Sequence, residues 1–178
     1  GFADIIVGAT QTDQNGLSDT GSAYIVFGGD SFTANIDLAT AGFRLDGAQA
    51  GANLGRSVTS AGDLNADGVD DIAVGAIGVS SNADEQAGAV YVVFGGDALP
   101  STLSADALNG QNGFALLGDD LGDQAGISVS GVGDINADGI DDLLVGAHLG
   151  EGDDQGAAYV IFGSNSGFAA SIDLDSLD

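Results

Sequence analysis

Two stretches of nine residues, 63–71 and 134–142, carry oxygen-bearing side chains at matching loop positions. Each has Asp or Asn at positions 1, 3, 5 and 9 and glycine at position 6. Alternate side chains of a tightly curved loop converge, glycine permits the sharp turn, and position 7 offers its backbone carbonyl. Because Ca²⁺ takes about six to eight oxygen ligands, this spacing predicts two calcium sites. The expected ligands are Asp63, Asn65, Asp67, the Val69 carbonyl and Asp71 in the first loop, and Asp134, Asn136, Asp138, the Ile140 carbonyl and Asp142 in the second.

The second half of each stretch departs from the EF-hand, which closes its loop with a bidentate Glu at position 12 and is flanked by helices. Position 12 here is Val74 or Val145, each inside a short apolar run, 72–76 or 143–147, of the kind that forms a β-strand. Each loop is therefore expected to join two strands, with the Asp at position 9 as the closing carboxylate.

Position 8 of each loop is a further carboxylate, Asp70 or Asp141, which we expect to point into water. An Asx-rich turn without metal is the alternative for both loops, because Asp, Asn and Gly are common in any turn. Carboxylates gathered in one loop repel each other without a cation, and the loop occurs twice, so metal binding is favoured.

The chain is built from repeats. Residues 62–76 and 133–147 agree at eleven of fifteen positions, and the four differences exchange one apolar residue for another. Tyr24, Tyr91 and Tyr159 begin equivalent apolar runs at steps of 67 and 68 residues. The period is therefore about seventy residues.

Each period holds four strand-like runs, read near 55–61, 71–77, 88–95 and 114–118. Four such runs in succession predict a four-stranded antiparallel meander, and radial repetition of meanders is the architecture of a β-propeller. The apolar residues of 88–95 follow one another without alternation, so both faces of the sheet are expected to be covered by neighbouring sheets.

These elements resemble the FG-GAP repeats of integrin alpha-subunit β-propellers, and especially their bacterial relatives in very large secreted or cell-surface proteins. In that family a Phe-Gly element opens the first strand, an Asp-x-Asp/Asn-x-Asp-Gly-x-x-Asp loop follows, and Gly-Ala-Pro closes the next strand. Here Leu54-Gly55 and Ala125-Gly126 stand for the first element, and Gly75-Ala76-Ile77 and Gly146-Ala147-His148 for the last. The Phe and the Pro are replaced, whereas the loop is intact. The resemblance implies an all-β fold of propeller blades with calcium loops between strands.

The repeat also sets the expected units. Residues 1–9 align with 68–76, so Asp4 stands at position 9 of a loop whose positions 1, 3 and 5 lie upstream, and we count it as a candidate metal ligand. If the four strands of a family blade are lettered A to D in chain order, unit 1–47 holds strands B to D, unit 48–118 holds strands A to D, and unit 119–178 holds strands A to C. About two and a half to three blades cannot close a ring, which has about four to eight. We therefore expect a segment of a longer chain, or copies that complete each other's blades.

Composition excludes several partners. The 27 acidic residues face only Arg44 and Arg56, which gives a formal charge of −25. Proteins that bind nucleic acid or anionic membranes need Lys and Arg to displace counterions, so both are poor partners for this chain.

No run of eighteen apolar residues is present, so membrane insertion is not expected. There is no cysteine, and calcium is expected to take the stabilising role that disulfides have in many secreted proteins.

The sequence shows no pattern typical of catalysis. His148 is the single histidine and has no partner at metal-ligand or catalytic spacing. The two arginines are expected to form ion pairs with nearby carboxylates.

The functional hypothesis is that the chain is a non-enzymatic, calcium-stabilised propeller segment of an extracellular, secreted or cell-surface protein. It would act in adhesion, surface or filament assembly by contacting its own repeats, other copies, or cell-surface proteins and glycans. The alternative is a carbohydrate-binding or accessory module of a secreted enzyme.

Overall fold

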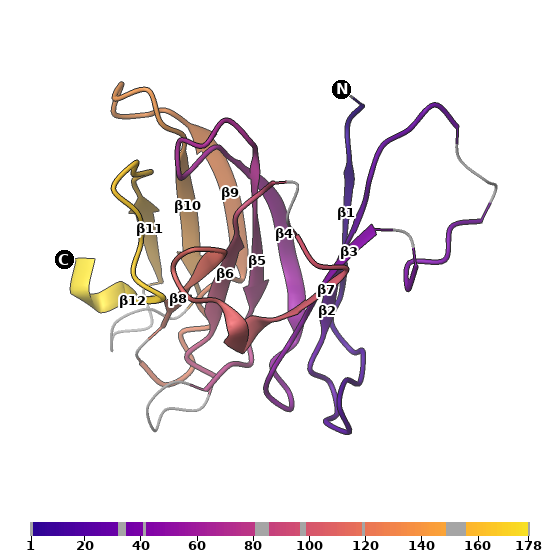
Figure 1. Cartoon of the computed structure of the whole chain (residues 1–178). Coiled ribbons are helices and arrows are strands. Elements are labelled where there is room, and N and C mark those ends of the chain that lie inside the picture. Colours follow the sequence, from indigo (N-terminus) through magenta and orange to yellow (C-terminus); the bar gives the residue numbers. More distant parts are fainter. Residues whose placement is uncertain are drawn as a thin grey trace.

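The computed structural model describes residues 2–31, 35–40, 42–80, 86–96, 99–118, 120–148 and 156–177. Within these ranges the regular structure consists of β-strands and two short 3₁₀ turns (Figure 1). The strands are β1 (Ile5–Ala9), β2 (Ser22–Val26), β3 (Gly42–Asp46), β4 (Leu54–Gly62), β5 (Asp71–Ala76), β6 (Ala89–Val93), β7 (Thr102–Ser104), β8 (Gly113–Leu117), β9 (Ser128–Gly133), β10 (Asp142–Ala147), β11 (Ala157–Ile161) and β12 (Ser171–Asp173). The turns are η1 (Ala105–Ala107) and η3 (Leu174–Leu177). No helix in the described part of the chain has the length and apolar character needed to cross a membrane.

The middle sheet contains the predicted meander. Strands β4, β5, β6 and β8 pair antiparallel in chain order, with Val74 opposite Tyr91 and Tyr91 opposite Ala115. These strands occupy the four predicted runs to within a few residues at each end. Valine, isoleucine and tyrosine fill the paired positions, and such side chains pack well on a pleated sheet. The prediction of four-stranded propeller blades is confirmed.

Two further sheets flank the middle one (Figure 1). The first sheet pairs β1, β2 and β3 antiparallel in chain order, and the third sheet pairs β9, β10 and β11 in the same way. Three, four and three antiparallel strands follow one another, as the repeat phase predicts. The division into units 1–47, 48–118 and 119–178 stays a prediction.

The sequence did not predict strands β7 and β12. Strand β7 lies between β6 and β8 in the chain but pairs in parallel with β3 of the first sheet. Strand β12 follows β11 and pairs in parallel with β8 of the middle sheet. The ring of Phe168, just before β12, stacks on Phe114 with 4.3 Å between centroids. Each connection after a third strand therefore extends the preceding sheet and ties neighbouring sheets together.

The apolar core lies between the sheets, in two clusters. Alternate residues of β6 face opposite ways: Tyr91 and Val93 pack toward the first sheet, and Val90 and Val92 toward the third. All four are buried, and burying such a side chain fully contributes about 1.5–3 kcal/mol. The expectation that both faces of the middle sheet are covered is confirmed.

Close approach of the sheets depends on two glycine pairs. A β-carbon on Gly8 would lie 2.0 Å from the backbone oxygen of Gly55, and one on Gly75 would lie 2.0 Å from the backbone oxygen of Gly126. Gly55 and Gly126 belong to the motif element that opens a blade, and Gly75 belongs to the element that closes its second strand. The two recurring elements of the repeat are thus the two sides of one contact between successive sheets.

The two arginines differ in their surroundings. Arg44 forms an ion pair with Asp46 at 2.8 Å, as expected. Arg56 is exposed and makes no ion pair within the ranges that the structure describes, so its expected ion pair stays a prediction. Of the repeated tyrosines, Tyr91 and Tyr159 are buried. Burial, with a smaller contribution from Asp106, raises the pKa of Tyr91 to about 12.

Candidate metal centres

The two Asp-rich loops each join neighbouring antiparallel strands. The first connects β4, which ends at Gly62, to β5, which begins at Asp71, and the second connects β9 to β10 in the third sheet. Both loops lie at the end of the sheets where the N-terminus is found (Figure 1). The prediction that the loops join strands rather than helices is confirmed.

Inside the first loop the backbone N–H groups point at the candidate ligands. The Asp67 N–H donates to Asp63 Oδ1 at 3.0 Å and to Asn65 Oδ1 at 2.9 Å. The Gly68 N–H donates to Asp63 Oδ2, and the Val69 N–H donates to Asp67 Oδ1, both at 2.9 Å. The chain therefore wraps around the side-chain oxygens at positions 1, 3 and 5.

The second loop repeats these bonds. The Asp138 N–H donates to Asp134 at 3.1 Å and to Asn136 at 2.9 Å, and the Gly139 N–H donates to Asp134 at 2.8 Å. The Ile140 N–H donates to Asp138 at 2.9 Å. The two copies of the sequence thus give the same loop curvature and the same internal bonds.

Curvature on this scale requires left-handed backbone at positions 4 and 6. Gly68 and Gly139, at position 6, have φ of 89° and 91°. An added β-carbon would have no other atom within 4 Å at either residue, so glycine is needed here for its backbone conformation and not for lack of space. Ala66 and Ala137 have φ of 60° and 61°. An alanine in this region costs roughly 1–2 kcal/mol, so both loops carry backbone strain at position 4.

The carboxylate at position 9 ties each loop to a third strand. Asp71 accepts the Leu64 N–H at 2.9 Å and the Gly95 N–H, just beyond β6, at 2.8 Å. Asp142 is bonded in the same way to Ile135 and Gly163, both at 2.9 Å. Both carboxylates are buried. Position 9 therefore locks the loop, its own strand and the next strand together.

Burial affects the titration of Asp71. Desolvation raises the pKa of its carboxyl from 3.8 to about 7, and the Asp67 and Asp63 charges add a smaller rise. The N–H groups of Gly95 and Leu64 oppose this shift. A cation nearby favours the charged form of such a group.

The donor set fits calcium in its chemistry. Each loop offers three carboxylates, one amide oxygen and the carbonyl at position 7, all of them the hard oxygen ligands that Ca²⁺ takes. A carboxylate oxygen that accepts one N–H bond keeps a second lone pair for a metal. Among the described residues, however, no three Asp, Glu, His or Cys side chains already stand close enough to hold an ion. The ligand roles of the ten loop residues stay predictions.

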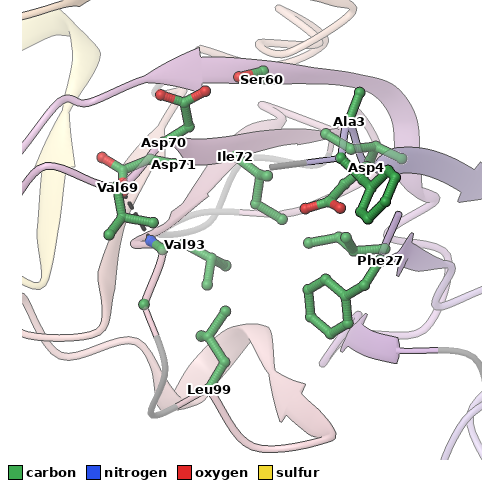
Figure 2. A pocket seen from close by; sticks show the side chains of 15 residues that line it. Ala3, Asp4, Phe27, Ser60, Val69, Asp70, Asp71, Ile72, Val93 and Leu99 are labelled. Carbon is green, nitrogen blue, oxygen red and sulfur yellow. Dashed lines mark hydrogen bonds between the residues drawn. The ribbon is translucent and has the colours of Figure 1, made fainter. Parts of the chain in front are cut away.

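The expectation that the position 8 carboxylates point into water was wrong for Asp141. Its carboxylate does not point into water but accepts the Asp63 N–H, in the loop of the neighbouring sheet, at 3.0 Å. Beside it, the Ser164 N–H donates to the Leu64 carbonyl at 2.8 Å. Asp70, the equivalent of Asp141, is exposed as expected (Figure 2). Recurrence of Asp at position 8 in both loops was the signal that could have indicated this contact.

The remaining candidate residues stand apart from both loops. Asp4 is exposed, just before β1, and accepts the Gly28 N–H at 2.7 Å, the same bond that Asp71 and Asp142 make to their third strands. It holds the structural place of position 9, while its role as a ligand stays a prediction. His148 is exposed at the end of β10 and its backbone N–H donates to the Asp123 carbonyl at 2.7 Å.

Comparison with known proteins identifies the repeat. The FG-GAP repeat family model matches residues 54–93 and 125–161, each of which contains a first strand and a loop and ends with a third strand. Phosphatidylinositol-glycan-specific phospholipase D of Bos taurus is 38% identical over 161 residues, 85% of this chain and 17% of that protein. Integrin alpha-4 of Xenopus laevis is 33% identical over 169 residues, 94% of this chain and 14% of that protein. Integrin alpha-3 of Cricetulus griseus is 38% identical over 125 residues, 69% of this chain and 11% of that protein. The chain spans less than a fifth of the length of these relatives.

Proposed function

Because the chain belongs to the integrin alpha-like FG-GAP repeat family and forms β-propeller blades, we propose that it is a calcium-stabilised, non-enzymatic propeller segment. It acts outside the cell, in adhesion, surface or filament assembly, through contacts with other proteins or with copies of itself. Integrin alpha relatives and the absence of any catalytic pattern in the sequence support the non-enzymatic role.

The observation that carries the proposal is the double occurrence of one loop with one set of internal bonds. In each loop three carboxylates and an amide oxygen are concentrated on one turn that bridges two strands. Asp71 and Asp142 extend each bridge to a third strand. A bound Ca²⁺ would supply positive charge at the point where carboxylates repel each other, so it would stabilise all three strands together.

The acidic surface is consistent with this setting. Two Ca²⁺ ions would bring the formal charge only from −25 to −21 (−25 + 4). A surface of that charge repels its own copies unless salt or calcium screens it. Association of copies, or contact with a partner, is therefore expected to strengthen in a calcium-rich medium such as the extracellular space.

The test is thermal unfolding in calcium and in EDTA. A ligand present at a hundred times its Kd stabilises the folded state by about 2.7 kcal/mol per site. For a chain of this size that shift corresponds to roughly 5–10 °C in Tm per site. Asp67→Ala and Asp138→Ala should each remove about half of the total calcium-dependent rise.

The matched control is Asp120→Ala, which removes one exposed carboxylate outside both loops and should leave the rise unchanged. A Tm that is equal in calcium and in EDTA would contradict the proposal. Beads coated with the chain should also cluster only when calcium is present, as a direct test of association.

The second candidate is an accessory or carbohydrate-binding module of a secreted enzyme. The similarity to a phospholipase D favours it, because the same repeat then accompanies an enzyme. A glycan array separates the two candidates. Specific glycan binding by the chain, without clustering of coated beads, would favour the accessory module.

A further inference from the structure

The sequence contains three Asn-Gly pairs, at 15–16, 109–110 and 112–113. In such a pair the backbone nitrogen of glycine can attack the side-chain carbonyl carbon of asparagine, because glycine has no β-carbon to hinder the approach. The attack needs a free glycine N–H, an asparagine side chain that can move, and access for water. The structure distinguishes the three pairs in each of these respects.

The pair Asn15-Gly16 is the tip of the hairpin between β1 and β2. Gln14 and Leu17 bond to each other on either side of it, at 2.9 and 3.2 Å, and φ is 53° at Asn15 and 80° at Gly16. These are the features of a type I′ turn, for which Asn-Gly is a preferred pair. Both residues are exposed, and an added β-carbon on Gly16 would have no atom within 4 Å. Among the described residues, neither the Asn15 side chain nor the Gly16 N–H forms a hydrogen bond, so both reacting groups are free.

The pair Asn109-Gly110 is held by its neighbours. Asn109 Oδ1 accepts the N–H of Gln111 at 2.8 Å and the N–H of Asn112 at 3.3 Å. The Gly110 N–H, which would have to attack, donates to the Gly113 carbonyl at 2.8 Å, and Gly110 is buried. Both reacting groups of this pair are therefore engaged in hydrogen bonds.

The pair Asn112-Gly113 is held at the start of β8. Asn112 Oδ1 accepts the Asn109 N–H at 3.0 Å, and Asn112 Nδ2 donates to the Ala107 carbonyl at 3.2 Å. Gly113 is buried and lies opposite Val93 in the pairing of β8 with β6. Two bonds thus fix this side chain, and the sheet fixes its glycine.

We propose that Asn15 is a site of spontaneous deamidation, and that the fold protects Asn109 and Asn112 from the same reaction. The Gly16 nitrogen bonds to Cγ of Asn15 and gives up its proton, while the bond from Cγ to Nδ2 breaks and ammonia leaves with that proton. One water molecule then opens the cyclic imide. Opening at Cγ gives aspartate in the normal backbone, and opening at the other carbonyl gives isoaspartate.

Either product changes the hairpin tip. Aspartate brings the formal charge from −25 to −26 (−25 − 1), and isoaspartate also inserts one carbon into the backbone. Because a two-residue turn cannot keep its geometry with a longer backbone, the pairing of Gln14 with Leu17 should open in the isoaspartate form. Water is the only co-reactant and no metal takes part, so the proposal does not rest on the proposed function.

The test is incubation of the intact chain at mildly alkaline pH, which favours the deprotonated nitrogen, followed by peptide mapping with mass spectrometry. Asn15 should react about tenfold or more faster than Asn109 or Asn112, because hydrogen bonds must first open at those two sites. Each deamidated Asn15 should release one ammonia. In urea, where the fold no longer protects any pair, the three rates should become similar.

The matched variant is Asn15→Gln, whose longer side chain would have to close a larger ring and therefore reacts far more slowly. It should remove the acidic form that ion exchange separates from the incubated chain, and it should leave the slow reaction at Asn109 and Asn112 unchanged. In the isolated isoaspartate form, hydrogen exchange of the Gln14 and Leu17 amides should be about tenfold or more faster than in the unmodified chain.

Two results would overturn the proposal. One is a rate at Asn15 in the folded chain that does not exceed the rates at Asn109 and Asn112. The other is a preference for Asn15 that persists undiminished in urea, because the selectivity would then come from the sequence and not from the fold.

Discussion

The loops at 63–71 and 134–142 have the same internal hydrogen bonds but different surroundings. Position 2 is Leu64 in the first loop, with 0% of its surface exposed, and Ile135 in the second, with 53% exposed. The amide of Asp63 is bonded to Asp141 of the third sheet, whereas among the described residues the Asp134 amide has no such partner. Nine residues of nearly identical sequence thus form one loop in two environments.

This difference separates features that follow from the loop's own sequence from features that follow from the sheet packed against it. Backbone curvature and the bonds to positions 1, 3 and 5 recur in both loops and join residues of the same loop, so they follow from local sequence. Burial and the contact with a position 8 carboxylate occur only where another sheet packs on the loop, so they follow from the neighbour. Calcium binding should therefore be alike in the two loops, and contributions to the core should not.

The largest expected effect is on the core. Leu64→Ala should lower the free energy of unfolding by about 2–5 kcal/mol, because it empties a fully buried site. Ile135→Ala should change it by no more than about 0.5 kcal/mol, because more than half of that side chain is already in water. Urea unfolding in calcium measures both.

Each variant serves as control for the other, since both remove apolar atoms from the same loop position. Equal losses of unfolding free energy in the two variants would mean that Leu64 and Ile135 are equally buried in solution. That result would contradict the difference in burial between them.

An intermediate effect is expected at position 8. Asp141→Ala should destabilise the chain by about 1 kcal/mol, because the Asp63 amide loses its acceptor. Asp70→Ala should change stability by no more than about 0.5 kcal/mol, because Asp70 is exposed. Hydrogen exchange of the Asp63 amide offers a local measurement, and it should accelerate only in the Asp141 variant. Acceleration in both variants would show that charge, and not the hydrogen bond, is responsible.

The smallest effect should be the same in both loops. Ala66→Gly and Ala137→Gly relieve left-handed strain at position 4, so each should be stabilising by up to about 1 kcal/mol. Thermal unfolding gives the sign, and the surface alanine Ala169, which has no positive φ, supplies an Ala→Gly control in which no gain is expected. A gain in only one of the two loops would contradict the view that local sequence determines their backbone.

The features that sequence predicted are those with local causes. Four strands per repeat could be located because apolar runs alternate with glycine-rich turns, and the loops because oxygen-bearing residues recur at fixed spacing. Strand β7 was missed because its three residues pair with β3, about sixty residues earlier in the chain, and show no periodicity of their own. The Asp141 contact was missed for a similar reason, since its partner lies 78 residues away in another sheet.

We propose that each loop binds one calcium ion and thereby stabilises the strands that it joins. Isothermal titration of the metal-free chain with Ca²⁺ tests it most directly, with Asp67→Ala and Asp138→Ala titrated in parallel. We expect two ions to bind to the chain and one to each variant, with the affinity of the remaining site unchanged because the two loops have the same internal structure. Absence of calcium uptake, or uptake that neither substitution alters, would contradict it.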